Sequence, residues 1–109
     1  MSMRVPTEAV ELMGSTLVAR RRDSNSPPVK GLFCPNCGIR VMHRRAGRDT
    51  VNIKPGTLDD TSWIVPVGHV WTRSAQAWFV PLPGALVYEG QPANFNALVA
   101  AWAAATQGL

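Results

Sequence analysis

The sequence predicts a mainly β domain that ends in a single C-terminal helix. Glycine and proline, nine of each among 109 residues, interrupt the apolar runs and forbid long helices through most of the chain. The run Ile39–His43 has the alternation of a half-buried strand. Near the end, Phe95, Leu98, Val99 and Trp102 follow helical spacing. Because 46% of the residues are hydrophobic, we expect one compact soluble domain with a modest core.

The first segment is expected to form a helical turn, a strand and a loop. Thr7 is placed to cap a short turn that carries the acidic residues Glu8 and Glu11. Thr16–Arg20 has the composition of a short strand. The polar, proline-broken stretch Asp23–Pro28 then predicts a loop.

A hairpin with a cysteine-bearing tip is expected next. Val29–Phe33 predicts a short strand that enters Cys34–Gly38, and Ile39–His43 predicts the returning strand. Arg44–Asp49 contains a glycine and is interpreted as a turn into the strand Val51–Ile53.

The second half of the chain gives weaker strand signals. Trp63–Val67 and His69–Trp71 are expected to be strands on either side of a glycine. Trp78–Val80 and Ala85–Tyr88 supply further apolar packing between prolines.

The C-terminal tail is expected to be a helix from about Asn94 to Thr106. Asn94 is suited to cap its start, and the face opposite the apolar stripe is alanine rather than charge. Both faces can therefore be buried, on the sheet or on a second subunit. We accordingly assign residues 1–93 to the β domain and residues 94–109 to the helix.

Positive charge is concentrated in the first half of the chain. The net charge is +4, and every Lys and Arg except Arg73 lies between Arg4 and Lys54. A cationic face would attract phosphate or carboxylate groups, including nucleic acid or the carboxylates of a small peptide such as glutathione. Alternatively, these are solvated loop charges that maintain solubility. No apolar run approaches the roughly 20 residues of a membrane span, and no signal peptide follows Met1–Arg4, so a cytoplasmic location without membrane contact is expected.

The two cysteines, Cys34 and Cys37, form a C-x-x-C pair with the spacing of half a tetrahedral zinc site. Pro35 restricts the turn, and Gly38 permits the open backbone that lets amides approach the sulfurs. A redox pair is a weaker alternative, because such pairs normally stand at a helix N-terminus and here strands flank the motif. Structurally inert cysteines are the remaining alternative.

The two histidines are secondary candidates for function. His43 lies six residues after Cys37 and is either a third metal ligand or an ordinary hydrogen-bonded strand residue. His69, beside apolar residues, is a plausible pocket residue and a weaker metal candidate.

Several segments occur in a telling order and spacing over about Val5 to Tyr88: Leu32–Arg40, Gly56–Asp60, Pro66, His69–Trp71 and Trp78. Together they resemble the second half of the glutathione-dependent formaldehyde-activating (GFA) family. The resemblance implies a mostly β fold of the β-tent type, built around zinc. It also implies a carbon-sulfur lyase type of activity, in which glutathione condenses with formaldehyde to S-hydroxymethylglutathione.

Carried over to this chain, the resemblance assigns Cys34 and Cys37 to the second pair of the family's four-cysteine structural zinc site. The first pair, a C-x-C, and the catalytic C-x-C-x-x-C both lie upstream of the segment that matches this chain's start, and the sequence contains neither. We therefore expect a GFA-like domain without its catalytic zinc ligands, and no catalytic residue is identified. His69, Trp71 and Trp78 would be strand or pocket residues, with core packing as the alternative.

No other catalytic pattern stands in for the missing cysteines. The sequence shows no Ser-His-Asp ordering and no phosphate-cradling glycine loop. Asp59 and Asp60 are adjacent, so in an extended strand they would face opposite sides, and we interpret them as turn residues.

Partner binding is expected because the upstream strands of the family would pair with sheet edges in this chain, and open edges invite partners. We expect a homodimer or a complex with another chain, in which paired C-x-x-C tips share one zinc. A non-catalytic zinc-binding or interaction module is the main alternative. A nucleic-acid-binding zinc ribbon is less favoured, because ribbons need a second cysteine pair.

Overall fold

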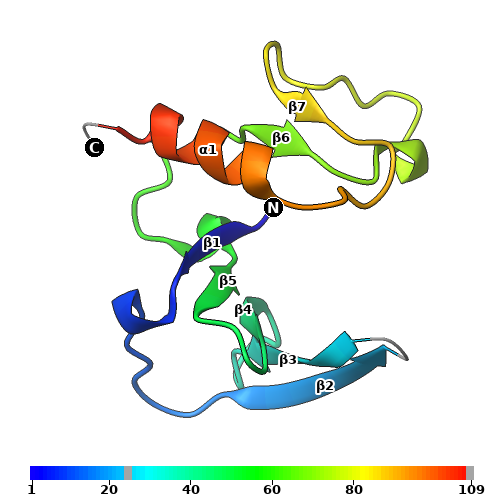
Figure 1. The fold of residues 1–109 in the computed structure, drawn as a ribbon. Coiled ribbons are helices and arrows are strands. Elements are labelled where there is room, and N and C mark those ends of the chain that lie inside the picture. The colour runs from blue at the N-terminus through cyan, green and yellow to red at the C-terminus, as the bar shows by residue number, and fades with distance from the viewer. Residues whose placement is uncertain (24–25, 108–109) are drawn as a thin grey trace. The chain divides into compact units, whose positions relative to one another are not determined.

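The computed structural model describes residues 1–23 and 26–107, which divide into two compact units. The first unit is Met1–Trp63 and the second is Ile64–Leu109. Strands predominate and one α-helix lies near the C-terminus, which confirms the mainly β class (Figure 1). The assignment of domains to residues 1–93 and 94–109 stays a prediction.

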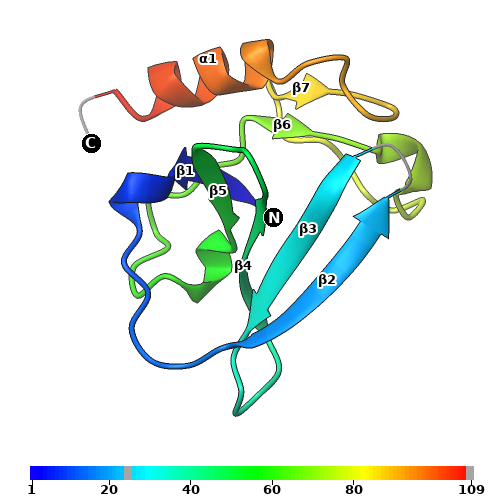
Figure 2. The ribbon, with the colours of Figure 1, turned by 60° about the horizontal axis from the view of Figure 1, so that its bottom comes forward.

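The first unit is built on a five-stranded antiparallel sheet with the strand order β1-β5-β4-β3-β2 (Figure 2). β2 and β3 form a long ribbon at one edge, and β1 forms the other edge. The strands are β1 (Met3–Pro6), β2 (Leu17–Asp23), β3 (Ser26–Phe33), β4 (Arg40–Arg45) and β5 (Thr50–Ile53), with 3-10 turns at Thr7–Ala9 and Pro55–Thr57.

The small core of this unit lies on one face of the sheet. Leu32, Met42 and Val51 are 1%, 6% and 3% exposed. The strand register places Leu32 opposite Met42, and Met42 opposite Ile53, so that apolar side chains from three strands share this face. Val5 pairs with Val51 and packs against the same cluster. Alternation along each strand therefore produces the core.

The expected hairpin with a cysteine tip is confirmed. β3 and β4 pair antiparallel, and a register shift next to Phe33 places that residue opposite Arg40. The tip closes with a hydrogen bond of 2.8 Å from the Cys34 amide to the Ile39 carbonyl.

The start of the chain differs from the sequence prediction. Residues Met3–Pro6 form the edge strand β1, which was not expected. The cap position of the following 3-10 turn is Pro6, without a side-chain cap, so the prediction that Thr7 caps the turn was wrong. The Thr7 amide instead donates a hydrogen bond of 2.8 Å to the carbonyl of Asp49, which ties the turn to the start of β5.

The second unit contains little regular structure before its helix. β6 (Gly68–His69) and β7 (Leu86–Val87) form a two-stranded parallel sheet, and a 3-10 turn spans Thr72–Ser74. The longer strands expected at Trp63–Val67 and His69–Trp71 are not formed beyond β6. Pro66 removes one backbone donor, and Trp71 adopts a left-handed backbone conformation (φ 59°) that ends the extended chain.

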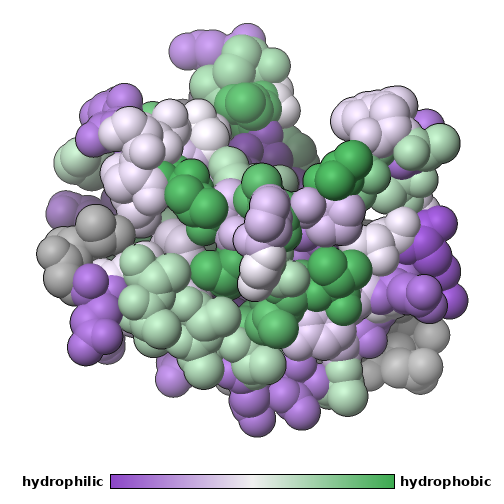
Figure 3. Space-filling model, turned by 90° about the horizontal axis from the view of Figure 1, so that it is seen from above, coloured by the Kyte–Doolittle hydropathy of each residue, from purple (hydrophilic) through white to green (hydrophobic). Residues whose placement is uncertain are grey.

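The predicted C-terminal helix is confirmed as α1 (Asn96–Ala105). The cap position of α1 is Phe95, without a side-chain cap, so the prediction that Asn94 caps the helix was wrong. The Oδ1 of Asn94 instead accepts a hydrogen bond of 3.0 Å from the amide of Asn96, the first residue of the helix. Leu98 and Trp102 are half-buried, whereas Val99 is 51% exposed. Hydrophobic side chains also reach the surface on the face seen in Figure 3. Within the described ranges, no helix has the length and apolar character needed to cross a bilayer.

An apolar hollow of about 570 Å³ lies within the second unit. The alanine face of α1 forms one side of it, through Ala97, Ala100 and Ala101. The other side comes from the segments around β6 and β7, including Val67 and Leu86. The alanine face thus borders open space rather than a filled core.

Candidate functional site

The C-x-x-C pair occupies the tip of the β3–β4 hairpin, as the sequence predicts. Cys34 is half-buried, Cys37 is exposed, and both are free thiols. Gly38 has φ 76°, a conformation that favours glycine, and its amide donates a hydrogen bond of 2.9 Å to the Cys34 carbonyl. This bond closes the turn and holds both cysteines on one short loop.

The backbone of the tip favours a thiolate at Cys34. Hydrogen bonds from the backbone amides of Cys37 and Asn36, and from the Cys37 thiol, lower the pKa of Cys34 below its ordinary value. The thiolate is the form that binds metal or attacks electrophiles. The tip therefore favours the deprotonated sulfur at Cys34.

The described residues offer only part of a zinc site. A structural zinc takes four protein ligands, and a catalytic zinc takes three and keeps one open position. Within residues 1–23 and 26–107, no three His, Cys, Asp or Glu side chains are grouped to hold a metal. Cys34 and Cys37 thus fit half of a structural site. The ligand set of a catalytic zinc built from cysteines does not fit, because the sequence holds no further cysteine.

His43 belongs to the sheet rather than to the tip. It lies on β4, where it is opposite Gly31 on one side and Asn52 on the other. Its Nε2 is 3.0 Å from Nδ2 of Asn52, which donates the hydrogen bond. This hydrogen bond and the place of His43 within β4 favour its interpretation as a hydrogen-bonded strand residue.

His69 has a structural place in the second unit. Its Nε2 accepts a hydrogen bond of 3.2 Å from the Leu82 amide. Its ring packs edge-on against Phe79, with ring centroids 5.1 Å apart. These contacts tie β6 to the loop that precedes β7.

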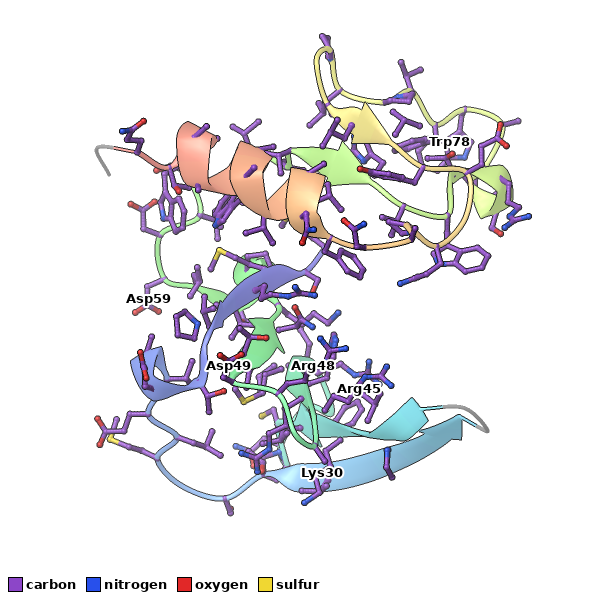
Figure 4. The ribbon with its side chains drawn as sticks, in the orientation of Figure 1. Lys30, Arg45, Arg48, Asp49, Asp59 and Trp78 are labelled. Carbon is purple, nitrogen blue, oxygen red and sulfur yellow. The ribbon has the colours of Figure 1, made fainter. Side chains whose placement is uncertain are left out.

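The two tryptophans singled out from the sequence differ in environment. Trp71 donates a hydrogen bond of 3.0 Å from Nε1 to Oε1 of Gln91, and the Arg73 guanidinium lies 5.0 Å from its ring centroid. Trp78 is 79% exposed, so the alternative of core packing is wrong for this residue (Figure 4).

Asp59 and Asp60 lie in a turn, as expected. The Asp60 carboxylate accepts hydrogen bonds from the Ser62 hydroxyl (2.6 Å) and amide (3.0 Å). These two bonds, the hydroxyl first, lower the pKa of Asp60. The Trp63 indole donates to the Asp60 carbonyl at 2.9 Å. The hydrogen bonds of Asp60 thus stabilise the turn, which supports its interpretation as a turn residue rather than an acid/base group.

A cationic hollow in the first unit was not identified from the sequence. It has a volume of about 390 Å³ and lies against β3, β4 and the turn that follows β4. The only feature of the sequence that pointed to this hollow was the excess of Lys and Arg in the first half of the chain. Its lining includes Lys30, Arg44, Arg45 and Arg48, together with Thr7 and the buried Val51.

Comparison with known families agrees with the resemblance seen in the sequence. The family model described as glutathione-dependent formaldehyde-activating enzyme matches residues 1–74. This stretch contains the cysteine tip, the aspartate turn and the cationic hollow. No curated protein matches the chain.

Proposed function

Because the chain belongs to the glutathione-dependent formaldehyde-activating enzyme family, we propose that it is a zinc-binding β domain of the tent type that serves the condensation of glutathione with formaldehyde. In that reaction the thiol sulfur bonds to the carbonyl carbon, the C=O π bond breaks, and the thiol proton passes to the oxygen. The product is S-hydroxymethylglutathione, and no oxidant or reductant is needed. A cytoplasmic location is part of the same proposal.

The observation that carries the proposal is the hairpin tip. Two thiols stand on one tight turn, and the amides of Cys37 and Asn36 favour the thiolate of Cys34. This arrangement supports metal binding over redox chemistry, because strands rather than a helix N-terminus flank the motif. A tetrahedral zinc then requires two further donors from outside the described residues.

We further propose that a second chain, in the simplest case another copy, supplies those donors. Paired tips would bring four thiolates to one ion, which predicts about half an equivalent of zinc per chain. When bound at a catalytic position, zinc can polarise a carbonyl oxygen or hold a thiolate. The cysteines for such a position are not in this sequence, so turnover would depend on a partner that contributes them.

A non-catalytic zinc-binding or interaction module is the second candidate. It is favoured by the exposure of large apolar side chains in the second unit, where Trp78 and Val80 are each 79% exposed. Such side chains mark interaction surfaces when they gather on one face.

The proposal is tested with untagged protein purified in the presence of zinc. Elemental analysis and native mass spectrometry give the zinc content and the number of chains per particle. Condensation of glutathione with formaldehyde is followed by NMR with carbon-13-labelled formaldehyde, above the uncatalysed rate. Zinc bound at half an equivalent together with turnover supports the family reaction. Zinc without turnover supports the interaction module, and a metal-free monomer refutes both.

A matched pair of variants assigns the metal to the tip. Cys34→Ser and Cys37→Ser each remove one sulfur donor and should abolish tight zinc binding. Ser74→Ala, a change in the second unit that removes no sulfur donor, is the control and should retain the zinc content of the unchanged chain.

A further inference from the structure

On the core face of the first sheet, an apolar pair of residues is followed directly by a pair of cationic residues. Leu32 on β3 lies opposite Met42 on β4, and both are buried. Two residues further along the strands, Lys30 lies opposite Arg44 on the same face. Arg44 in turn lies opposite Val51, which is 3% exposed. A pair of cations therefore stands directly beside the core.

This placement is electrostatically unfavourable in the chain alone. Like charges directly opposite each other on neighbouring strands destabilise a sheet. Lys30 is half-buried and Arg44 is exposed. Among the described residues, no carboxylate forms an ion pair with Lys30, Arg44 or Arg48. Asp49 follows Arg48 but does not line the hollow, and its carbonyl is used by the Thr7 amide.

The hollow over this cation pair has the dimensions of a small-molecule site. Its volume of about 390 Å³ falls within the range of roughly 300–1,000 Å³ that is usual for ligand pockets. Figure 4 labels Lys30, Arg45 and Arg48, which come from β3, β4 and the turn after β4. Val51 and Pro28 add an apolar wall, and Thr7 adds a hydroxyl group.

We infer that this hollow binds the carboxylates of a small acidic peptide, of which glutathione is the member that the proposed function supplies. Arginine forks match carboxylate geometry, and several cations around one hollow favour a ligand with more than one anionic group. Glutathione carries a carboxylate at each end and a flexible, partly apolar middle. The inference rests on the proposed function for the identity of the ligand, whereas the anion-binding chemistry rests on the hollow itself.

The test measures binding without chemistry. S-methylglutathione, whose thiol is blocked, is titrated into the full chain at low ionic strength and followed by isothermal calorimetry. We expect saturable binding that weakens as salt is added, because exposed charges are screened. The dimethyl ester of the same peptide lacks both carboxylates and should not bind. Inorganic phosphate is the third probe and should bind more weakly than the peptide.

Variants locate the site. Arg44→Gln and Lys30→Gln should each weaken binding by about tenfold or more, the usual loss for a charged hydrogen bond. Both variants relieve like-charge repulsion and are expected to fold, which circular dichroism checks. Lys54→Gln is the matched control, since it removes one positive charge from the same unit outside the hollow, and should change affinity by less than about twofold.

Three outcomes would overturn the inference: equal affinity of the pocket variants and the unchanged chain, binding of the ester as tight as that of the acid, or phosphate bound more tightly than the peptide. The last would assign the hollow to phosphate groups instead. The titration tests the hollow independently of the proposed function, because it requires neither zinc nor formaldehyde. Peptide binding without turnover refutes only the function, and turnover without an effect of these variants refutes only the pocket.

Discussion

Truncation of Leu32 tests whether the stability of the first unit depends on its three-residue core. Leu32 is 1% exposed at the centre of β3 and packs with Met42 and Val51. Leu→Ala changes at buried sites cost about 2–5 kcal/mol, from lost transfer energy and from the cavity that remains. A domain of this size has a free energy of unfolding of about 5–15 kcal/mol, and a core this small places the unit toward the lower end. Leu32→Ala should therefore remove a large part of its stability.

The assay is urea denaturation followed by far-ultraviolet circular dichroism. Val18→Ala is the matched control, because Val18 lies directly opposite Leu32 on β2 and is 54% exposed. It should cost less than about 1 kcal/mol, the span of strand propensities. If the two variants lower the free energy of unfolding by similar amounts, or if Leu32→Ala lowers it by less than about 1 kcal/mol, the identification of the core is refuted.

Three further predictions concern the Cys34 thiol, the packing at Gly68 and the shared zinc. Because amide hydrogen bonds lower the pKa of Cys34, alkylation of the metal-stripped Cys37→Ser variant should begin at lower pH in the folded chain than in urea. The thiolate's contribution to stability is correspondingly present above the unfolded-state pKa and lost as the pH falls through the folded-state pKa; identical pH midpoints would contradict this. Gly68→Ala should destabilise the second unit, since its Cβ would collide with the Leu98 side chain, whereas Gly56→Ala meets nothing within 4 Å and should be neutral by thermal melting. Zinc added to the chain should promote dimers in native mass spectrometry, and a chelator should reverse the effect if the tips share the ion.

The sequence predicted those elements whose stabilising contacts lie within a few residues of one another along the chain. The alternation in Ile39–His43 and the C-x-x-C turn are short-range features, so the hairpin and its tip were predicted before any packing was known. The tail helix was likewise predicted, because its apolar spacing recurs within a few residues. The family resemblance also came from the order of such segments.

Long-range pairing was not predictable in the same way. Met3–Pro6 became a strand only because β5 offers it a partner, and its own sequence has no alternation strong enough to show this. Thr7 does not have its expected capping role because the 3-10 turn begins at Thr7 itself, with Pro6 at the cap position. Trp78 gave the same signal as a core aromatic but lies at the surface.

The sequence by itself determined the strand-rich character, the cysteine hairpin, the tail helix and the family. Only the tertiary structure decided that Lys30 and Arg44 stand face to face beside the core, and that His43 serves the sheet rather than the tip. The physical reason is that the sequence shows which residues are charged, whereas the pairing register of the strands decides which charges lie next to each other. A shift of one residue between β3 and β4 would move these cations to opposite faces of the sheet.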